Sequence, residues 1–473
     1  MQDANWILTS EGLNPFPRII FSELTLFKPW RYFDYFQKTD TDTKIFKNGL
    51  SLNIKMKKMT LIIPPFPKLF DPTIFPPLGI LYIAAVLEKN NFEVKICDLR
   101  DDFDLTKIPE ADIYGTAGHV TEVAELRQIG KYLEGKGQRI IGGVHATHMP
   151  EDFVGYYDAI LRGDGEITIL DIINNQLAGI INGKTVEDIN TVPFPARHLL
   201  PRNRIVSKDA LGGYGYSEKS PEATVLYTSR GCPFKCAFCS NIPQPIRFHS
   251  PEYVLSEIKY LMETYSVSHF NIMDDHFTLN RSRLKKLAEL LGPLNIGFKC
   301  MVRPDSLDEE ICVLLKKMGC SEVQMGLESA DEKVLRLMNK PLDLEKVKET
   351  IKRVKSHGIM AKTFLIAGLP GETWESIEKT KQFIRETQPD KCPPTLFMPF
   401  PVCDIWKNPE KYGVKILTKE YSRYFFRYPT ESVIETKECS AKELTEHFNH
   451  LRDYVNSNEW RKLRPQSGSH NGR

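Results

Sequence analysis

From Met59 onward, short apolar runs alternate with amphipathic segments along the chain. The run MTLIIPP at residues 59–65 predicts a buried strand, and PPLGILYIAAVLEKNN at residues 76–91 predicts a helix opened by proline. Such alternation predicts a parallel, doubly wound sheet, whose ligands lie beyond the carboxyl ends of the strands. The other elements predicted in this series are strands at residues 92–99, 111–118 and 138–143 and a helix at residues 122–137.

A second series of strands and helices begins at residue 223. Residues 183–222 separate the two series with TVPFPARHLLPRN and a Gly/Tyr/Ser-rich stretch, which predict a linker over the surface. The six strand–helix units of the second series are fewer than the eight of a closed barrel, so we expect a partial (βα)6 barrel with an open mouth. Its strands are predicted at residues 223–229, 269–275, 296–302, 322–329, 361–368 and 394–400.

These patterns predict an α/β protein with a Rossmann-like doubly wound domain, a partial barrel and a small helical C-terminal tail. In the tail, Ser440 and Glu443 predict the capping box of one helix. The aromatic residues before Met59 show no clear period. The predicted parts are a weakly ordered extension (1–58), the Rossmann-like domain (59–182), the linker (183–222), the barrel (223–403) and the tail (404–473), whose end at 464–473 is expected to be disordered.

Charge and hydropathy narrow the possible partners and surroundings. The chain has 63 Lys and Arg against 61 Asp and Glu, so no overall basic field recommends nucleic acid as a partner. It has neither a long apolar run of membrane-spanning length nor the start of a signal peptide. We therefore expect a cytoplasmic protein without a transmembrane segment, in which scattered cysteines are reduced core thiols.

One stretch, TSRGCPFKCAFC at residues 228–239, gathers Cys232, Cys236 and Cys239 directly after the first strand of the second series. Three thiolates can bind three irons of a four-iron cluster and leave the fourth iron open for a small molecule. The alternative is a zinc site completed by a distant Cys or His. Structural zinc sites usually use two paired cysteine hooks, and this sequence contains no second pair.

The C-x3-C-x2-C spacing after a strand resembles the radical S-adenosylmethionine superfamily, and the resemblance covers about residues 223–400. It implies that Cys232, Cys236 and Cys239 bind a [4Fe-4S] cluster whose open iron is chelated by S-adenosylmethionine. Reductive cleavage of that cofactor then yields a 5′-deoxyadenosyl radical. The protein supplies placement and electrostatics for this cofactor chemistry.

The resemblance also implies contacts to S-adenosylmethionine at the ends of the barrel strands. Phe238 would lean on the adenine, with a core aromatic as the alternative. Asp274 and Asp275 stand where the family has Gly-Gly-Glu, at the methionine end of the cofactor. Arg303 would pair with the cofactor carboxylate through a bidentate fork, with a surface ion pair as the alternative.

Two further strand ends complete this set. Glu328 and Ser329 would contact the ribose, since carboxylate and hydroxyl groups suit its diol. Gly368 and Gly371 would let the backbone approach the adenine, with a tight turn as the alternative. After the last strand, PFPVCD departs from the Pro-x-Pro-Gly-Thr of related enzymes, and Cys403 is either a packing residue or a thiol that acts on substrate.

The first domain carries Gly142 and Gly143 at the end of its fourth predicted strand, in IIGGVHATHMPED at residues 140–152, and LRGDGE follows at residues 161–166. With the opening strand and PPLGILYIAA, these segments resemble the cobalamin-binding domain of class B radical methylases. His119 and His145 are expected to be core or surface histidines, so cobalamin would bind base-off without a histidine ligand. The residues implied to line cobalamin are Pro77, Leu78, Thr116, Gly142, Gly143, Val144, Gly163 and Glu166.

These resemblances predict a cobalamin-dependent radical enzyme that methylates an unactivated carbon of a small molecule or lipid. Its cofactors would be the [4Fe-4S] cluster, S-adenosylmethionine and cobalamin, with an electron donor such as flavodoxin or ferredoxin. One alternative keeps both cofactors but cyclises or rearranges a ring, as the anaerobic Mg-protoporphyrin monomethyl ester cyclase does. Another is a non-catalytic sensor that uses its cluster or cobalamin to report redox state.

Overall fold

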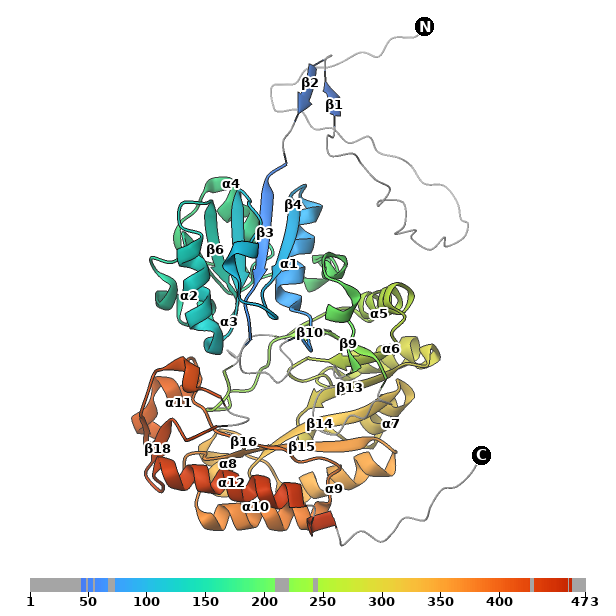
Figure 1. Ribbon diagram of the computed structural model, residues 1–473. Coiled ribbons are helices and arrows are strands. Elements are labelled where there is room, and N and C mark those ends of the chain that lie inside the picture. The colour runs from blue at the N-terminus through green and yellow to red at the C-terminus, as the bar shows by residue number, and fades with distance from the viewer. Residues whose placement is uncertain are drawn as a thin grey trace, which may run out of the picture. The chain divides into compact units, whose positions relative to one another are not determined.

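Figure 1 shows the computed structural model of the chain. It describes residues 56–66, 73–208, 221–240, 246–425, 429–457 and 459–461, together with the backbone of strands β1 (Lys44–Lys47) and β2 (Leu50–Asn53). The two short strands pair with each other and belong to a separate unit, Met1–Lys55. Most of the predicted N-terminal extension, part of the predicted linker and the predicted disordered end lie outside the described residues.

The first sheet of the unit Met56–Arg473 is wholly parallel, in the order β4-β3-β5-β6-β7-β8. From β3 the chain first adds β4 on one side and then β5 to β8 on the other side. The strand order therefore changes direction between β3 and β5, which makes this position the topological switch point. The strands are β3 (Lys58–Ile63), β4 (Glu93–Asp98), β5 (Ile113–Ala117), β6 (Gln138–Gly142), β7 (Ala159–Arg162) and β8 (Gly179–Asn182). The helices are α1 (Leu78–Lys89), α2 (Val123–Tyr132), α3 (Gly143–His148) and α4 (Thr168–Asn175).

The doubly wound sheet is confirmed, and its first four strands match the predicted ones. Strand β3 shows no alternation of polar and apolar residues because both of its faces are buried. Only Lys58 at its start is exposed. Strands β7 and β8 were not predicted from the sequence. Both are four residues long, and β8 at the sheet edge is mostly exposed, so it lacks the apolar run that marked the others.

The second sheet is also parallel, in the order β16-β15-β14-β13-β12-β9. Its strands follow one another in chain order without closing, which confirms the partial barrel. The strands are β9 (Ala223–Leu226), β12 (His269–Ile272), β13 (Gly297–Val302), β14 (Cys320–Glu328), β15 (Met360–Ala367) and β16 (Pro394–Leu396). The helices are α5 (Pro251–Tyr265), α6 (Arg281–Leu291), α7 (Glu309–Lys317), α8 (Glu332–Leu337), α9 (Leu344–Ser356) and α10 (Trp374–Thr387).

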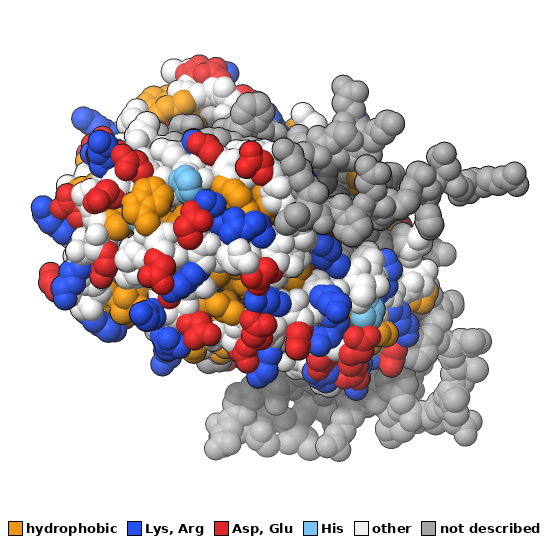
Figure 2. Space-filling view, turned by 90° about the horizontal axis from the view of Figure 1, so that it is seen from below, with side chains coloured by type: hydrophobic (Ala, Val, Ile, Leu, Met, Phe, Trp, Pro, Cys, Tyr) orange, Lys and Arg blue, Asp and Glu red, His pale blue; other side chains and the backbone are white. Residues whose placement is uncertain are grey.

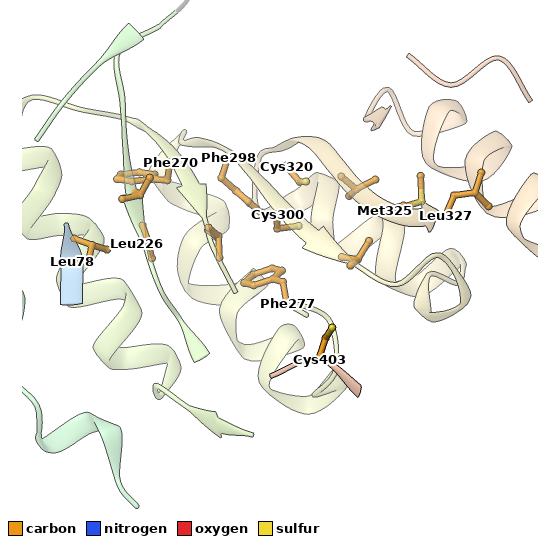
Figure 3. Packing of buried hydrophobic residues seen from close by; sticks show 14 of the residues in the cluster. Leu78, Leu226, Phe270, Phe277, Phe298, Cys300, Cys320, Met325, Leu327 and Cys403 are labelled. Carbon is orange, nitrogen blue, oxygen red and sulfur yellow. The ribbon is translucent and has the colours of Figure 1, made fainter. Parts of the chain in front are cut away.

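The barrel core consists of apolar side chains from neighbouring strands. Figure 3 shows Phe270 and Phe298 beside Cys300 and Cys320, whose thiols are buried among them. Cys97, Cys312, Cys392 and Cys439 are buried as well, as expected for core thiols. On the face shown in Figure 2, acidic and basic side chains are interspersed, in keeping with the small net charge.

The C-terminal tail contributes α11 (Asp404–Lys407) and α12 (Ala441–Ser457), and α12 packs against β15 and β16. The predicted capping box is confirmed, since Ser440 N donates to Glu443 Oε2 at 2.8 Å and Glu443 N donates to Ser440 Oγ at 3.4 Å. Among the described helices, none combines the length and apolarity needed to cross a bilayer.

The predicted linker differs from a surface loop, because much of its first half is buried. Arg197 is fully buried and donates to Glu257 Oε1 of α5 at 2.7 Å and to the carbonyl oxygen of Val225 at 3.0 Å. One residue earlier, Ala196 N donates to the carbonyl oxygen of Leu81 in α1. The linker therefore joins the first sheet's helix layer to the barrel.

Candidate functional site

The three clustered cysteines lie on a loop at the carboxyl side of β9. This loop starts from β10 (Ser229–Arg230), which pairs antiparallel with β11 (Arg247–Phe248). Cys232, Cys236 and Cys239 are each half-buried, and none of the three forms a disulfide. In the described part of the chain, no three His, Cys, Asp or Glu side chains converge as they would around a single ion. Thiolates that bind three different irons of a cluster need no such convergence.

Asp274 anchors the start of this loop. Its Oδ1 accepts from the backbone N–H groups of Thr228 and Ser229 at 2.6 and 3.0 Å, and its Oδ2 accepts from their hydroxyls at 2.5 and 2.7 Å. Asp274 is 1% exposed, and this burial raises the pKa of its carboxyl. Asp275, in contrast, is exposed. Of the two predicted cofactor contacts after β12, Asp274 thus positions the cysteine loop.

The segment Met338–Asn339–Lys340, just after α8, holds the middle of the cysteine loop. Ala237 N donates to the carbonyl oxygen of Met338 at 2.9 Å. Asn339 Nδ2 donates to the carbonyl oxygen of Lys235 at 2.7 Å. Nothing in the sequence analysis pointed to this segment, because it lies about a hundred residues from the cysteines.

Lys340 is buried beside the cysteines and forms an ion pair with Glu328, with Nζ 2.6 Å from Oε1. Glu328 ends β14 with a φ of 66°, which is unusual for a residue other than glycine. Gly326 leaves room for the pair, since a Cβ there would lie 2.4 Å from Glu328 Oε1 and 2.5 Å from Lys340 Nζ. The next residue, Ser329, is also buried, and its Oγ accepts from Asp331 N.

Arg303 lies over the cysteine loop, with its Cζ 4.0 Å from the centroid of the Phe234 ring. Asp305 holds the guanidinium through Nε and Nη2 at 3.0 and 2.8 Å. His276 stacks on the same ring at 5.9 Å, and its burial lowers the pKa to about 4, so the imidazole is neutral at pH 7. Arg303 therefore forms an ion pair with Asp305 and also lies over Phe234 of the cysteine loop.

Two cations thus act on the thiols of the loop. Burial raises the pKa of the Cys236 thiol, and the charges of Lys340 and Arg303 oppose this rise. Phe238, between the last two cysteines, is half-buried against the core with Lys340 Nζ 5.8 Å from its ring centroid. Lys340 and Arg303 thus place two cations, each paired with a carboxylate, beside the thiols of the loop.

The glycines after β15 form a tight turn. Gly368 and Gly371 have φ values of 83° and 82°, which an L-residue rarely adopts. Gly368 N donates to Glu372 Oε1, which lies 3.0 Å from Nδ1 of His447 on α12. The turn alternative for these glycines is therefore what the structure contains, and the buried Glu372–His447 pair fixes it to the tail.

The predicted cobalamin contacts gather mainly at the carboxyl edge of the first sheet. Gly143, with a φ of 87°, starts α3 directly after β6, and a Cβ there would lie 3.0 Å from Cβ of Ala117 at the end of β5. Val144 is 47% exposed at this edge. Gly142, Gly143 and Val144 follow β6, Thr116 lies in β5, Gly163 and Glu166 follow β7, and Pro77 and Leu78 begin α1.

These eight residues are not equally open. Thr116 Oγ1 donates to the carbonyl oxygen of Ile62, and Leu78 is buried in the core. Gly163 is exposed, and its N–H donates to Thr147 Oγ1. His145 is buried with Nε2 2.8 Å from Asp152 Oδ2, which agrees with its predicted role as a core histidine.

Ion pairs connect the edge of the first sheet to the cysteine loop. Glu166 Oε1 lies 2.7 Å from Nη2 of Arg230, two residues before Cys232. On the paired strand β11, Arg247 binds Asp164. The strands β10 and β11, which we call the cysteine hairpin, are therefore both joined by ion pairs to the loop that follows β7. The spacing of residues in the sequence does not reveal this connection.

The tail makes a second connection between the same two regions. Ile405 N donates to the carbonyl oxygen of Ala237 in the cysteine loop. Further on, the Tyr421 ring lies edge-on to His145 at 5.1 Å. Cys403 is buried and caps α11 by accepting from Trp406 N at 3.3 Å. Val402 before it has a φ of 100°, a strained value for a β-branched residue.

Comparison with known proteins agrees with this geometry. Residues 226–384 match the Radical SAM superfamily. The chain is 28% identical over 78% of its length to an uncharacterised methyltransferase of Pyrococcus horikoshii, of which it covers 87%. It is 25% identical over 75% of its length to the anaerobic magnesium-protoporphyrin IX monomethyl ester cyclase of Rubrivivax gelatinosus, of which it covers 69%.

Among solved structures, the fold resembles that of the radical S-adenosylmethionine methyltransferase TsrM of Kitasatospora setae, with a TM-score of 0.61. The two chains are 16% identical, and the likeness covers 77% of this chain and 78% of the other. That structure contains bound cobalamin and a [4Fe-4S] cluster. The likeness covers more of the chain than the superfamily match alone, so both sheets have counterparts in a single known fold.

Proposed function

We propose that this chain belongs to the cobalamin-binding family of radical S-adenosylmethionine enzymes and methylates an unactivated carbon of a small molecule or lipid. The main support for the proposal is the direct linkage between the carboxyl edge of the first sheet and the mouth of the partial barrel. The cysteine hairpin at the barrel mouth is tied by ion pairs to the glycine-bearing edge of the first sheet. A methyl donor and a radical source bound at these edges would face a common substrate.

The cysteine loop fits a [4Fe-4S] cluster. Its three thiols form no disulfide and are half-buried at the carboxyl side of the barrel strands, and cations lie beside them. S-adenosylmethionine would lie along the ends of β12 to β15. There Asp275 offers an exposed carboxylate, and Arg303 and Glu328 are held in place by Asp305 and Lys340.

The first sheet fits a large planar ligand. Gly142, Gly143 and Gly163 present backbone without side chains at its carboxyl edge, next to the exposed Val144. His145 is engaged with Asp152 and Tyr421, whereas His119 after β5 is exposed. We propose that neither binds cobalt, so that cobalamin binds base-off. The tail, which reaches from the cysteine loop to this edge, would enclose one side of the substrate space.

When bound, the cluster and S-adenosylmethionine supply a 5′-deoxyadenosyl radical, and cobalamin supplies the methyl group. The chain's own residues would position these groups. Asp274 fixes the loop that carries the cysteines, and Arg230 and Arg247 fix the distance of that loop from the first sheet. An external one-electron donor of the flavodoxin or ferredoxin class would reduce the site.

The relationship to the anaerobic cyclase supports a second candidate, in which the same cofactors oxidise and close a ring. Product mass separates the candidates, because methylation adds one methylene unit to the substrate and cyclisation does not. A redox sensor would produce no 5′-deoxyadenosine at all.

The test is anaerobic reconstitution of the full chain with iron, sulfide, cobalamin, S-adenosylmethionine and dithionite. We expect about four irons per chain, bound cobalamin and formation of 5′-deoxyadenosine. A cell extract added to the reaction should contain a molecule that gains one methylene unit. Cys236→Ser should abolish 5′-deoxyadenosine, whereas the matched control Cys97→Ser, in β4, should retain it. Protein that bound zinc and neither cofactor would contradict the proposal.

A further inference from the structure

In the function proposed so far, Lys340 only holds Glu328 in place, yet the structure also fixes it beside the cysteines. The two residues before it grip the cysteine loop, since Met338 accepts from Ala237 N and Asn339 donates to the carbonyl oxygen of Lys235. Its own N–H donates to the carbonyl oxygen of Leu335. The backbone of Lys340 therefore cannot shift relative to the loop without breaking these bonds.

The ammonium group is also placed by its surroundings. Lys340 is 5% exposed, and Nζ lies 2.6 Å from Glu328 Oε1 and 5.8 Å from the Phe238 ring centroid. A lysine is seldom buried so completely unless a partner holds its charge. Glu328 thus holds the ammonium group next to the cysteine loop, close to Phe238, which lies between Cys236 and Cys239.

We infer that Lys340 raises the reduction potential of the cluster bound by Cys232, Cys236 and Cys239, and that Glu328 partly offsets this effect. The inference rests on the proposed function, since it requires a cluster at these cysteines. Reduction by one electron adds one negative charge next to Cys236, and a fixed cation stabilises that charge. Local charge and hydrogen bonding are among the factors that set cluster potentials. Because Lys340 and Glu328 are buried, solvent screens them only weakly.

The sign of the effect gives a sharp test. Lys340→Met removes the cation, so the reduced form loses stabilisation and the potential falls. Glu328→Gln removes the opposing anion, so the potential rises. Lys340→Arg keeps the charge and should leave the potential near that of the wild type. General loosening of the loop would not shift Lys340→Met and Glu328→Gln in opposite directions.

The experiment is an EPR-monitored redox titration of the reconstituted full chain without S-adenosylmethionine, so that contacts to that cofactor do not enter. At a fixed potential we expect Lys340→Met to lower the ratio of reduced to oxidised cluster at least tenfold, which is about 59 mV for one electron. The matched control is Lys352→Met, an exposed lysine on α9, which should not shift the potential.

The outcomes separate this inference from the proposed function. Wild-type protein that holds no [4Fe-4S] cluster would overturn both. Wild-type protein with a cluster whose potential is the same in Lys340→Met and Glu328→Gln would overturn the inference alone. If Lys340→Met fails to fold with Glu328 left unpaired, the rise in Glu328→Gln decides the question: its presence supports the inference and its absence refutes it.

Discussion

At the scale of single residues, Glu122 illustrates how burial changes a carboxyl group near the edge of the first sheet. It is 3% exposed, and Oε2 accepts from His119 N at 3.0 Å. Gly118 makes room for it, because a Cβ there would lie 2.3 Å from that oxygen. Burial raises the pKa of Glu122 to about 8, since one backbone N–H does not replace the water that a carboxylate needs.

This residue predicts a pH dependence of stability. Its folded pKa is about 8, well above the 4.5 of the unfolded chain, so its contribution is fully present below pH 4.5 and is lost as the pH rises through 8. Each unit of separation corresponds to about 1.4 kcal/mol. Urea unfolding between pH 5 and 9 should therefore show a steeper loss of stability in the wild type than in Glu122→Gln.

The matched control for that measurement is Glu134→Gln, an exposed glutamate after α2. It should follow the wild-type curve. A curve for Glu122→Gln with the wild-type slope would show that the folded protein does not hold a protonated carboxyl at this position.

At the scale of elements, the β10–β11 hairpin carries the cysteine loop and depends on contacts outside itself. The two strands contribute only two residue pairs, Ser229 with Phe248 and Arg230 with Arg247. So short a ribbon is not stable alone. Asp274 on the β12 side and the acidic loop after β7 supply the missing support.

Asp274→Asn should weaken this support. In the wild type, one carboxylate oxygen accepts from two backbone N–H groups and the other accepts from two hydroxyls, all of Thr228 and Ser229. The amide nitrogen of asparagine cannot accept, so either the two N–H groups or the two hydroxyls lose their acceptor. We expect a loss of about 1–3 kcal/mol in unfolding free energy and a lower iron content after reconstitution. Denaturation curves and iron analysis measure both quantities.

The neighbouring substitution Asp275→Asn is the control for stability, because this carboxylate is exposed. Equal unfolding free energies for the two variants would contradict the anchoring role of Asp274.

At the scale of the whole unit Met56–Arg473, the linker is a structural joint between the two sheets. Arg197 and Glu257 form an ion pair with side-chain exposures of 0% and 1%. Arg197 also donates to β9 through the carbonyl oxygen of Val225, and the linker beside it binds α1. A charge buried so fully is tolerated only with its partner present.

Removal of one partner should therefore be costly. Arg197→Met leaves the Glu257 carboxylate buried and unpaired, and we expect a loss of about 3–5 kcal/mol in unfolding free energy. The double variant Arg197→Met with Glu257→Met should recover much of this loss. Arg202→Met, which breaks the exposed pair with Glu222 in the same linker, should cost at most about 1 kcal/mol.

Urea denaturation of the four proteins measures these differences. If Arg197→Met were as stable as Arg202→Met, the linker would not depend on the buried pair of Arg197 and Glu257.

Much of the fold could be predicted from local patterns. Apolar runs marked all six strands of the partial barrel, and Ser440 with Glu443 marked the start of α12. These signals are local, because the strand or cap is defined by neighbouring residues. Strand β8 escaped prediction because its residues are mostly exposed and its pairing is decided by β7.

The candidate site likewise has a part that the sequence predicted and a part that it did not. The spacing of Cys232, Cys236 and Cys239 within eight residues is a local motif, so the sequence by itself determined the cysteine loop and its place after a strand. Lys340, Glu166 and Asp164 approach that loop from about 65 to 105 residues away in the chain. Only the tertiary structure decided these contacts, because charged side chains distant in sequence carry no mark of the partner that folding brings to them.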